Sequence, residues 1–156
     1  MNNNFMKSAA DEALRGMHSG HGGPFGAVIV RGDEIIACEH NRVLVSNDPT
    51  MHAEIAAIRV ACGKLERFSL HDCEIYSTCM PCPMCLGAIM WAKIPTLYYG
   101  ASAVDAAAAG FDDDYIYEYI KGGFADSSRL AFKEVDGDKC RELFDVWNKK
   151  KDRGMY

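Results

Sequence analysis

The sequence predicts an α/β fold, a three-layer α/β/α sandwich built on a mixed sheet of about five strands. Short β-branched and apolar runs alternate with helix-length segments, and two of these form strand–helix–strand connections. Such connections favour parallel neighbouring strands with right-handed crossovers. Apolar residues make up 49% of the 156 residues, a share typical of a globular domain. Because there is no repeat and no linker-like stretch, we expect a single domain over residues 1–156.

The first half of the chain has the patterns of two helices and a hairpin. Apolar residues at helical spacing predict the first helix, and the glycines that follow predict a loop. Two apolar, β-branched runs on either side of Gly32 and Asp33 predict the hairpin. We expect Gly63 to end the second helix at its C′ position. The expected ranges are helix 4–19, loop 20–26, strands 27–31 and 34–39, turn 47–50 and helix 52–62.

The second half begins as strand, helix and strand. Pro81 and Pro83 mark the start of a buried helix, since proline is tolerated in a first helical turn. Gly100 ends the strand that follows, and a later apolar run predicts a fifth strand. The expected ranges are strand 74–78, helix 82–92, strand 96–99, helices 101–109 and 111–121, strand 129–135 and helix 138–151.

Charge and cysteine content exclude several functional classes. The 22 acidic and 17 basic residues give a net charge of −5, which argues against a protein that mainly grips phosphate backbones. No apolar run approaches the roughly 18 residues of a membrane span. Residues 1–4 lack the features of an export signal, so we expect a cytoplasmic location. The seven cysteines are an odd number, which favours reduced thiols over a disulfide scaffold.

His52, Cys82 and Cys85 form the strongest functional pattern. Catalytic zinc takes three protein ligands and leaves a fourth position for water, and one imidazole with two thiolates supplies such a set. Cys82 and Cys85 are three residues apart at a helix start, so both sulfurs face one side. His52 opens the other helix, and the three ligands converge if both helices begin at the same end of the sheet. The alternative is a structural zinc site with Cys79 as fourth ligand.

Glu54 is the expected proton carrier of this site. It lies two residues after His52 and therefore on another side of the helix, which excludes it as a ligand but lets it reach a metal-bound water. Zinc lowers the pKa of such a water from about 16 to about 7. A nearby carboxylate can take that proton and return it to a ring nitrogen and a leaving amine, help typically worth about 10²–10⁴-fold. A structural zinc site would leave Glu54 without a role.

These residues complete a pattern, His-x-Glu with Pro-Cys-x-x-Cys, that is typical of zinc nucleobase deaminases. The chain resembles the cytidine deaminase-like superfamily and, within it, the short zinc-dependent bacterial guanine deaminases. Gly-Phe-Asp-Asp at 110–113 and the terminal Tyr156 separate that family from the tRNA wobble adenosine deaminases, which share the metal motif. Met80 is a departure, because it stands where these families usually carry glutamate. The resemblance is carried by the stretches 22–30, 46–50, 52–54, 79–89 and 108–113.

The resemblance implies a reaction and a way of holding its substrate. The reaction would be hydrolytic deamination of guanine to xanthine and ammonia by a zinc-bound hydroxide, with Glu54 as proton shuttle. Asn41, which has an amide donor and an acceptor, would hold the N7/O6 edge of the ring. Asp113 would accept from the N1/amino edge. Phe25 would lie against the ring face, and the Ala53 backbone could also hold the ring.

The resemblance also implies a partner, a second copy of the chain. In a homodimer with exchanged C-terminal segments, Tyr156 would reach the pocket of the other subunit. We expect a small purine base as the ligand and neither membrane nor nucleic acid as a partner. Four histidines without partners at metal spacing are expected on the surface or in loops: His18, His21, His40 and His71.

Other functions stay open at this point. Relatives with nearly the same motif act on guanosine, other aminopurines or triazines. An RNA adenosine deaminase of the tRNA wobble type would use the same pocket, with basic residues at 149–153 as an RNA contact. A zinc-stabilised interaction module without catalysis would leave Glu54 dispensable.

Overall fold

The computed structural model describes residues 3–155, and the chain divides into two compact units, Met1–Asp114 and Tyr115–Tyr156. The first unit contains one sheet with the strand order β2-β1-β3-β4. Its strands are β1 Gly26–Arg31, β2 Glu34–His40, β3 Glu74–Cys79 and β4 Thr96–Ala101. The helices of the chain are α1 Asn3–His18, α2 Val43–Ser46, α3 Ala53–Leu65, α4 Pro83–Trp91, α5 Ala103–Ala108, α6 Asp114–Lys121 and α7 Gly137–Lys149.

The sheet is mixed, as expected. Strand β1 pairs antiparallel with both β2 and β3, and β3 pairs parallel with β4. The hairpin between β1 and β2 turns at Gly32, whose φ of +60° suits glycine. The connection through α4 joins parallel neighbours, but the one through α3 does not. Since β1 lies between β2 and β3, these two strands are parallel without being adjacent, which corrects the expected pairing.

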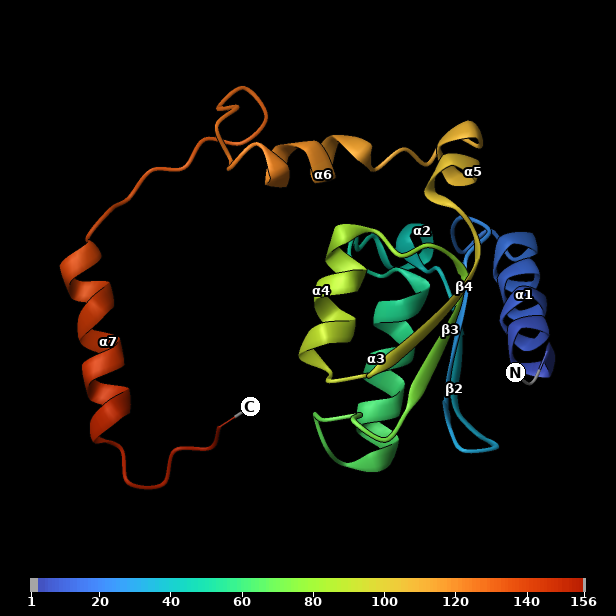
Figure 1. Cartoon of the computed structure of the whole chain (residues 1–156), viewed down its shortest axis with the longest axis horizontal. Coiled ribbons are helices and arrows are strands. Elements are labelled where there is room, and N and C mark those ends of the chain that lie inside the picture. The colour runs from blue at the N-terminus through green and yellow to red at the C-terminus, as the bar shows by residue number, and fades with distance from the viewer. Residues whose placement is uncertain (1–2, 156) are drawn as a thin grey trace. The chain divides into compact units, whose positions relative to one another are not determined.

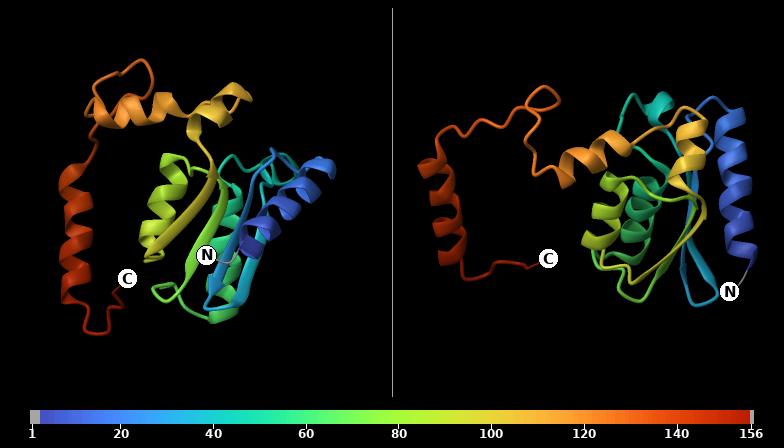
Figure 2. Two further views of the ribbon diagram at one scale, coloured as in Figure 1. Left: turned by 45° about the vertical axis from the view of Figure 1, so that its right-hand side comes forward. Right: turned by 45° about the horizontal axis from the view of Figure 1, so that its top comes forward.

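Helices cover both faces of the sheet, which confirms the α/β/α layering (Figures 1 and 2). Alternate side chains of β1 point to opposite faces, as the period of two requires. Ala27 and Ile29 belong to the core shared with α3 and α4. Val28 and Val30 belong to a second core, against Phe5 of α1. All four β1 side chains are fully buried, so β1 is the centre of the unit.

Helix α3 is longer than its sequence pattern indicates. Gly63 does not end it, because the helix continues to Leu65 and Glu66 adopts the left-handed conformation with φ of 52°. Leu65 packs against the core, so tertiary contact draws one further turn into the helix. The Glu66 N–H donates back to carbonyls in the last turn, which closes the helix there.

The strand expected at 129–135 does not form, and the sheet has four strands rather than about five. Leu130 and Phe132 are exposed, and within residues 3–155 no sheet ladder includes this stretch. An alternating apolar pattern favours a strand only where a neighbouring strand supplies hydrogen bonds and packing. Without that edge, the stretch stays irregular.

The second unit, taken by itself, packs locally. The Tyr119 hydroxyl donates to the Leu130 carbonyl at 2.6 Å, and Phe124 lies between the rings of Tyr119 and Phe132. None of its described side chains is buried. Within residues 3–155, no helix combines the length and the apolar character that crossing a bilayer would require.

Candidate metal and active site

Two helix starts bring the expected metal ligands together. His52 is the N-cap of α3 and Cys82 is the N-cap of α4, both with extended backbone. Pro83 occupies the first turn of α4, where its missing N–H costs nothing. Neither N-cap side chain forms a capping hydrogen bond with its own helix, so both remain able to bind a metal ion. Cys85, one turn further along α4, is fully buried.

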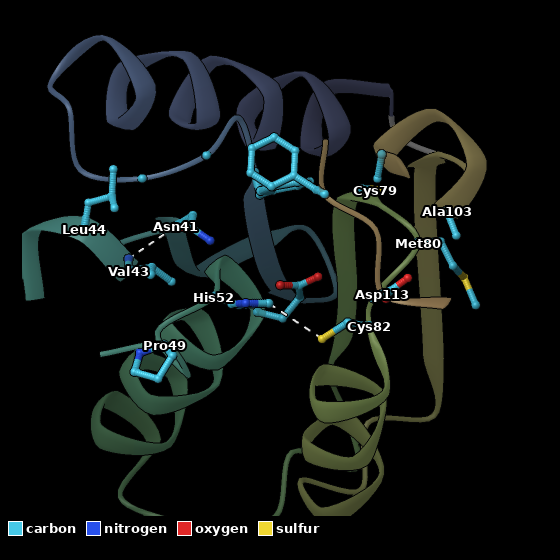
Figure 3. Close-up of a pocket in the computed structure, with 16 residues that line it drawn as sticks. Asn41, Val43, Leu44, Pro49, His52, Cys79, Met80, Cys82, Ala103 and Asp113 are labelled. Carbon is cyan, nitrogen blue, oxygen red and sulfur yellow. Dashed lines mark hydrogen bonds between the residues drawn. The ribbon is translucent and has the colours of Figure 1, made fainter. Parts of the chain in front are cut away.

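The ligand atoms of His52, Cys82 and Cys85 lie within 4.8 Å of one another. His52 Nδ1 is 3.6 Å from each of the two sulfurs, and Figure 3 shows its contact with Cys82. One nitrogen and two sulfurs are the donor types that zinc prefers. Cys79 is not part of this group, because its sulfur contacts the Ser102 carbonyl at 3.5 Å. The geometry therefore favours three protein ligands over a closed four-ligand site.

The cysteine pair shares its protons unequally. Hydrogen bonds from Cys85 and His52 lower the pKa of the Cys82 thiol to about 4. The Cys82 contact and burial raise the pKa of Cys85, and the hydrogen bond with Cys82 raises that of His52. A thiolate is the metal-binding form of cysteine. The site thus presents one thiolate even before a metal displaces the second proton.

Glu54 lies beside this group and is almost fully buried. Its Oε1 accepts a hydrogen bond from Ser77 Oγ at 3.0 Å, and the Cys85 sulfur lies 3.4 Å from Oε2. Burial raises the pKa of the Glu54 carboxyl above its ordinary value. A carboxylate in this position can hold and release a proton next to the candidate metal ligands.

A cavity of about 420 Å³ opens next to the ligand group, and the residues that line it all belong to the first unit. Asn41 and Asp113 lie on opposite sides of this cavity, with His52 and Cys82 between them (Figure 3). The Val43 N–H donates to Asn41 Oδ1 at 3.1 Å, which fixes the amide and leaves its NH₂ group on the cavity side. Burial raises the pKa of Asp113.

The other expected substrate residues differ in where they lie. Phe25 lines the cavity, and its ring and that of Phe111 pack edge to face with their centroids 4.9 Å apart. Ala53 is fully buried in the core and is not among the lining residues. Tyr156 lies outside the described residues. The structure thus brings Phe25, Asn41 and Asp113 to one cavity with the metal ligands.

The sequence analysis did not predict two features of the site, the contact of Ser77 with Glu54 and the position of Met80 in the cavity wall. Ser77 is a polar residue on the same face of β3 as Ile75, a core residue, and this polar interruption of an inward face is the signal that could have identified it. Met80 lines the cavity, so the position that departs from the family pattern shapes the pocket directly. Its backbone N–H donates to the Ala101 carbonyl at 2.9 Å, which holds the loop between β3 and α4.

One of the four histidines expected on the surface or in loops is buried. His40 is 1% exposed at the end of β2, and its ring contacts both Glu12 and His21. Spacing along the chain gave no sign of this, because 12, 21 and 40 are distant in sequence.

Comparisons with known proteins agree with this geometry. Residues 1–101 match the model of the cytidine and deoxycytidylate deaminase zinc-binding region. The chain is 48% identical over 143 residues to guanine deaminase of Bacillus subtilis, covering 92% of this chain and 91% of that one. It is 42% identical over 97 residues to a tRNA-specific adenosine deaminase of Aquifex aeolicus, covering 62% and 64%.

Solved structures show the same relation. The structure of B. subtilis guanine deaminase superimposes with a TM-score of 0.92 at 44% identity and covers 100% of this chain and 99% of that one. A guanine deaminase from Nitrosomonas europaea superimposes with a TM-score of 0.69 at 30% identity, covering 72% and 65%.

Proposed function

The chain belongs to the cytidine and deoxycytidylate deaminase family of zinc-binding enzymes, and on this premise we propose that it hydrolyses guanine to xanthine and ammonia. In this reaction a C2–O bond forms and the C2–N bond to the amino group breaks. The observation that carries the proposal is one cavity lined by Glu54 and by two of the candidate metal ligands, His52 and Cys82, and bordered by Asn41 and Asp113.

The residues fit the zinc ion that the family implies. His52 Nδ1 and the sulfurs of Cys82 and Cys85 would hold it, and the adjoining cavity provides room for water and substrate. When bound, zinc supplies a Lewis acid that activates water near neutral pH. Glu54 would take a proton from the attacking water and give it to a ring nitrogen, and would then carry the second water proton to the amino group, which leaves as ammonia. The hydrogen bond from Ser77 Oγ to Glu54 Oε1 fixes the orientation of this carboxyl group.

The cavity walls recognise guanine by its two polar edges. The Asn41 NH₂ donates to the N7/O6 edge, since its carbonyl oxygen is held by Val43. Asp113 accepts from N1–H and the amino group on the opposite side. Phe25 provides a flat apolar face for the ring. The Ala53 backbone remains a proposed contact, as does Tyr156 from outside the described residues.

Ammonia release tests this function. The zinc protein is offered guanine, guanosine, adenine, cytosine and a tRNA anticodon stem-loop in parallel, with Glu54→Gln as the blank. We expect turnover of guanine above all others and none in the blank. Turnover of the stem-loop, with salt-sensitive binding, would replace guanine by an RNA adenosine as the substrate. Full activity of Glu54→Gln would exclude the proposed mechanism.

Chelation tests the metal separately. A zinc chelator should abolish ammonia release, and added Zn²⁺ should restore it. If the chelated protein remains fully active, the His52–Cys82–Cys85 group is not the catalytic metal site.

We further propose that the chain acts as a homodimer in which the C-terminal segment is exchanged, while residues 1–156 form one functional domain. Support comes from α7, whose apolar side chains Leu143, Phe144, Val146 and Trp147 are exposed in the single chain. Such a face needs a covering surface. Sedimentation equilibrium that shows a fully active monomer would refute the dimer. A cytoplasmic location is also proposed, because all seven cysteines are free thiols.

A further inference from the structure

A hydrogen-bonded network of Glu12, His40 and His21 lies behind the cavity wall that carries Asn41. Glu12 of α1 accepts a hydrogen bond from His40 Nδ1 at 2.6 Å. His40 Nε2 lies 2.8 Å from Nδ1 of His21, and the two rings are stacked. Arg15 binds the same Glu12 carboxylate from the neighbouring turn of α1. Three segments distant in sequence are thus joined through one buried imidazole.

The direction of the hydrogen bond between His40 and Glu12 follows from the chemistry of the two groups. An ionised carboxylate only accepts, so His40 Nδ1 carries a proton. Burial works against ionisation of Glu12, but the hydrogen bonds from Arg15 and His40 outweigh it and hold the pKa of the carboxyl below its ordinary value. In the contact between His40 Nε2 and His21 Nδ1, one ring nitrogen donates and the other accepts, so each imidazole holds the other in place.

The Glu12–His40–His21 network connects directly to the cavity wall. The His21 carbonyl accepts from the N–H groups of Leu44 and Val45 at 3.0 and 3.2 Å, which anchors α2. Asn41 follows His40 in sequence, and its N–H donates to the Phe25 carbonyl at 3.0 Å. Holding His21 and His40 therefore also holds Asn41, Phe25 and Leu44, all of which line the cavity.

Two glycines show how closely these parts fit. A Cβ at Gly16 would lie 2.2 Å from Cδ2 of His40, and a Cβ at Gly22 would lie 2.0 Å from Asn41 Oδ1. Atoms do not approach so closely, so any side chain at either position would displace the His40 ring or the Asn41 amide. The backbone of α1 and of loop 20–25 is packed against these two side chains.

We propose that His21 and His40, held by Glu12, are positioning residues that set the Asn41 side of the cavity for substrate recognition. They do not touch the substrate, and they act through Asn41 and the loop that contains Phe25. The proposal deepens the guanine deaminase function and rests on it. Glu54 and the metal ligands lie on other elements. Loss of the Glu12–His40–His21 network should therefore weaken substrate binding and leave the chemical step unchanged.

The first test compares His21→Ala with His21→Asn, because an asparagine amide can replace Nδ1 of histidine. We expect His21→Ala to raise KM for guanine about tenfold, the scale of one lost hydrogen bond, with kcat changed less than about twofold. His21→Asn should restore most of KM. His71→Ala, an exposed histidine, is the matched control and should behave as wild type. Zinc content should stay equal in all variants.

Gly16→Ala perturbs the same Glu12–His40–His21 network from α1, because the added methyl group would push on the His40 ring. It should raise KM in the same way. It provides a second variant if His21→Ala does not fold. A fall in kcat at unchanged KM, in either folded variant, would overturn the proposal, as would an unchanged KM with unchanged kcat.

Amide hydrogen exchange measures the same geometry without substrate. In His21→Ala the Leu44 and Val45 amides should exchange faster than in wild type and in His71→Ala, because their common acceptor is no longer held in place. Unchanged exchange would overturn the positioning role. If the wild type does not deaminate guanine, the proposed function fails by that result, while exchange at Leu44 and Val45 still decides whether His21 holds the wall.

Discussion

The two units of the chain differ in what they bury. Residues up to 114 form a sheet covered on both faces, with Ile29, Leu70 and Ile75 fully buried, and they contain the lining of the site cavity. From residue 115 onward no described side chain is buried, although apolar residues are frequent there. The first unit thus contains the cavity and the candidate metal ligands on a packed core, whereas the second leaves its apolar side chains exposed.

The largest expected effect separates the units by their chemistry. Glu54→Gln should lower kcat for guanine by about 10²–10⁴-fold, because the proton carrier is lost while the metal ligands remain. Glu142→Gln makes the same change on α7 in the second unit and should leave kcat as in wild type. Ammonia release and zinc content measured on both variants test this. Equal effects of the two substitutions would contradict the contrast.

A matched pair of leucines tests the difference in burial. Leu70→Ala removes a fully buried side chain and should lower the free energy of unfolding by about 2–5 kcal/mol. Leu130→Ala removes an exposed side chain and should change it by less than about 0.5 kcal/mol. Urea denaturation measures both. A large loss for Leu130 would show that this residue is covered in the assembled protein.

The apolar face of α7 provides the next test. The double variant Phe144→Ala, Trp147→Ala should weaken self-association about 30-fold or more, because large aromatic side chains supply much of the energy of an interface. Leu14→Ala, an exposed leucine on α1, serves as the control and should associate as wild type does. Sedimentation equilibrium gives the dissociation constants. Unchanged association of the double variant would mean that α7 is not at the interface.

The smallest expected effect concerns helix capping. Ser102 and Asp105 form a capping box at the start of α5, so Ser102→Ala should lower the free energy of unfolding by about 1 kcal/mol. Ser128 forms a comparable local bond to Asp126 in an exposed turn of the second unit, and Ser128→Ala should cost less. Thermal unfolding of both variants compares the units at the level of one hydrogen bond. A larger loss of stability for Ser128→Ala than for Ser102→Ala would contradict the view that local hydrogen bonds contribute more to stability in the first unit.

Local patterns in the sequence determined much of the first unit. The hairpin around Gly32, the helix starts at His52 and Cys82 and the spacing of Cys82 and Cys85 all depend on residues a few positions apart. Dihedral preference, proline in a first turn and the i, i+3 spacing of cysteines act over one helical turn. Such short-range patterns suffice to name Glu54 and the three candidate ligands from the sequence.

Tertiary structure decided what depends on distant residues. The helix starts converge because α3 and α4 pack on the same face of one sheet, and α3 continues past Gly63 because Leu65 reaches the core. The expected strand at 129–135 is absent because a strand needs a partner edge.

The hydrogen bond from Ser77 to Glu54 and the chain from Glu12 through His40 to His21 join residues 19 or more positions apart. Sequence alone determined the chemical groups of this protein, since those follow from residue type and short-range spacing. Only the fold decided their partners, because the free energy of a buried polar contact depends on which distant group is brought to meet it.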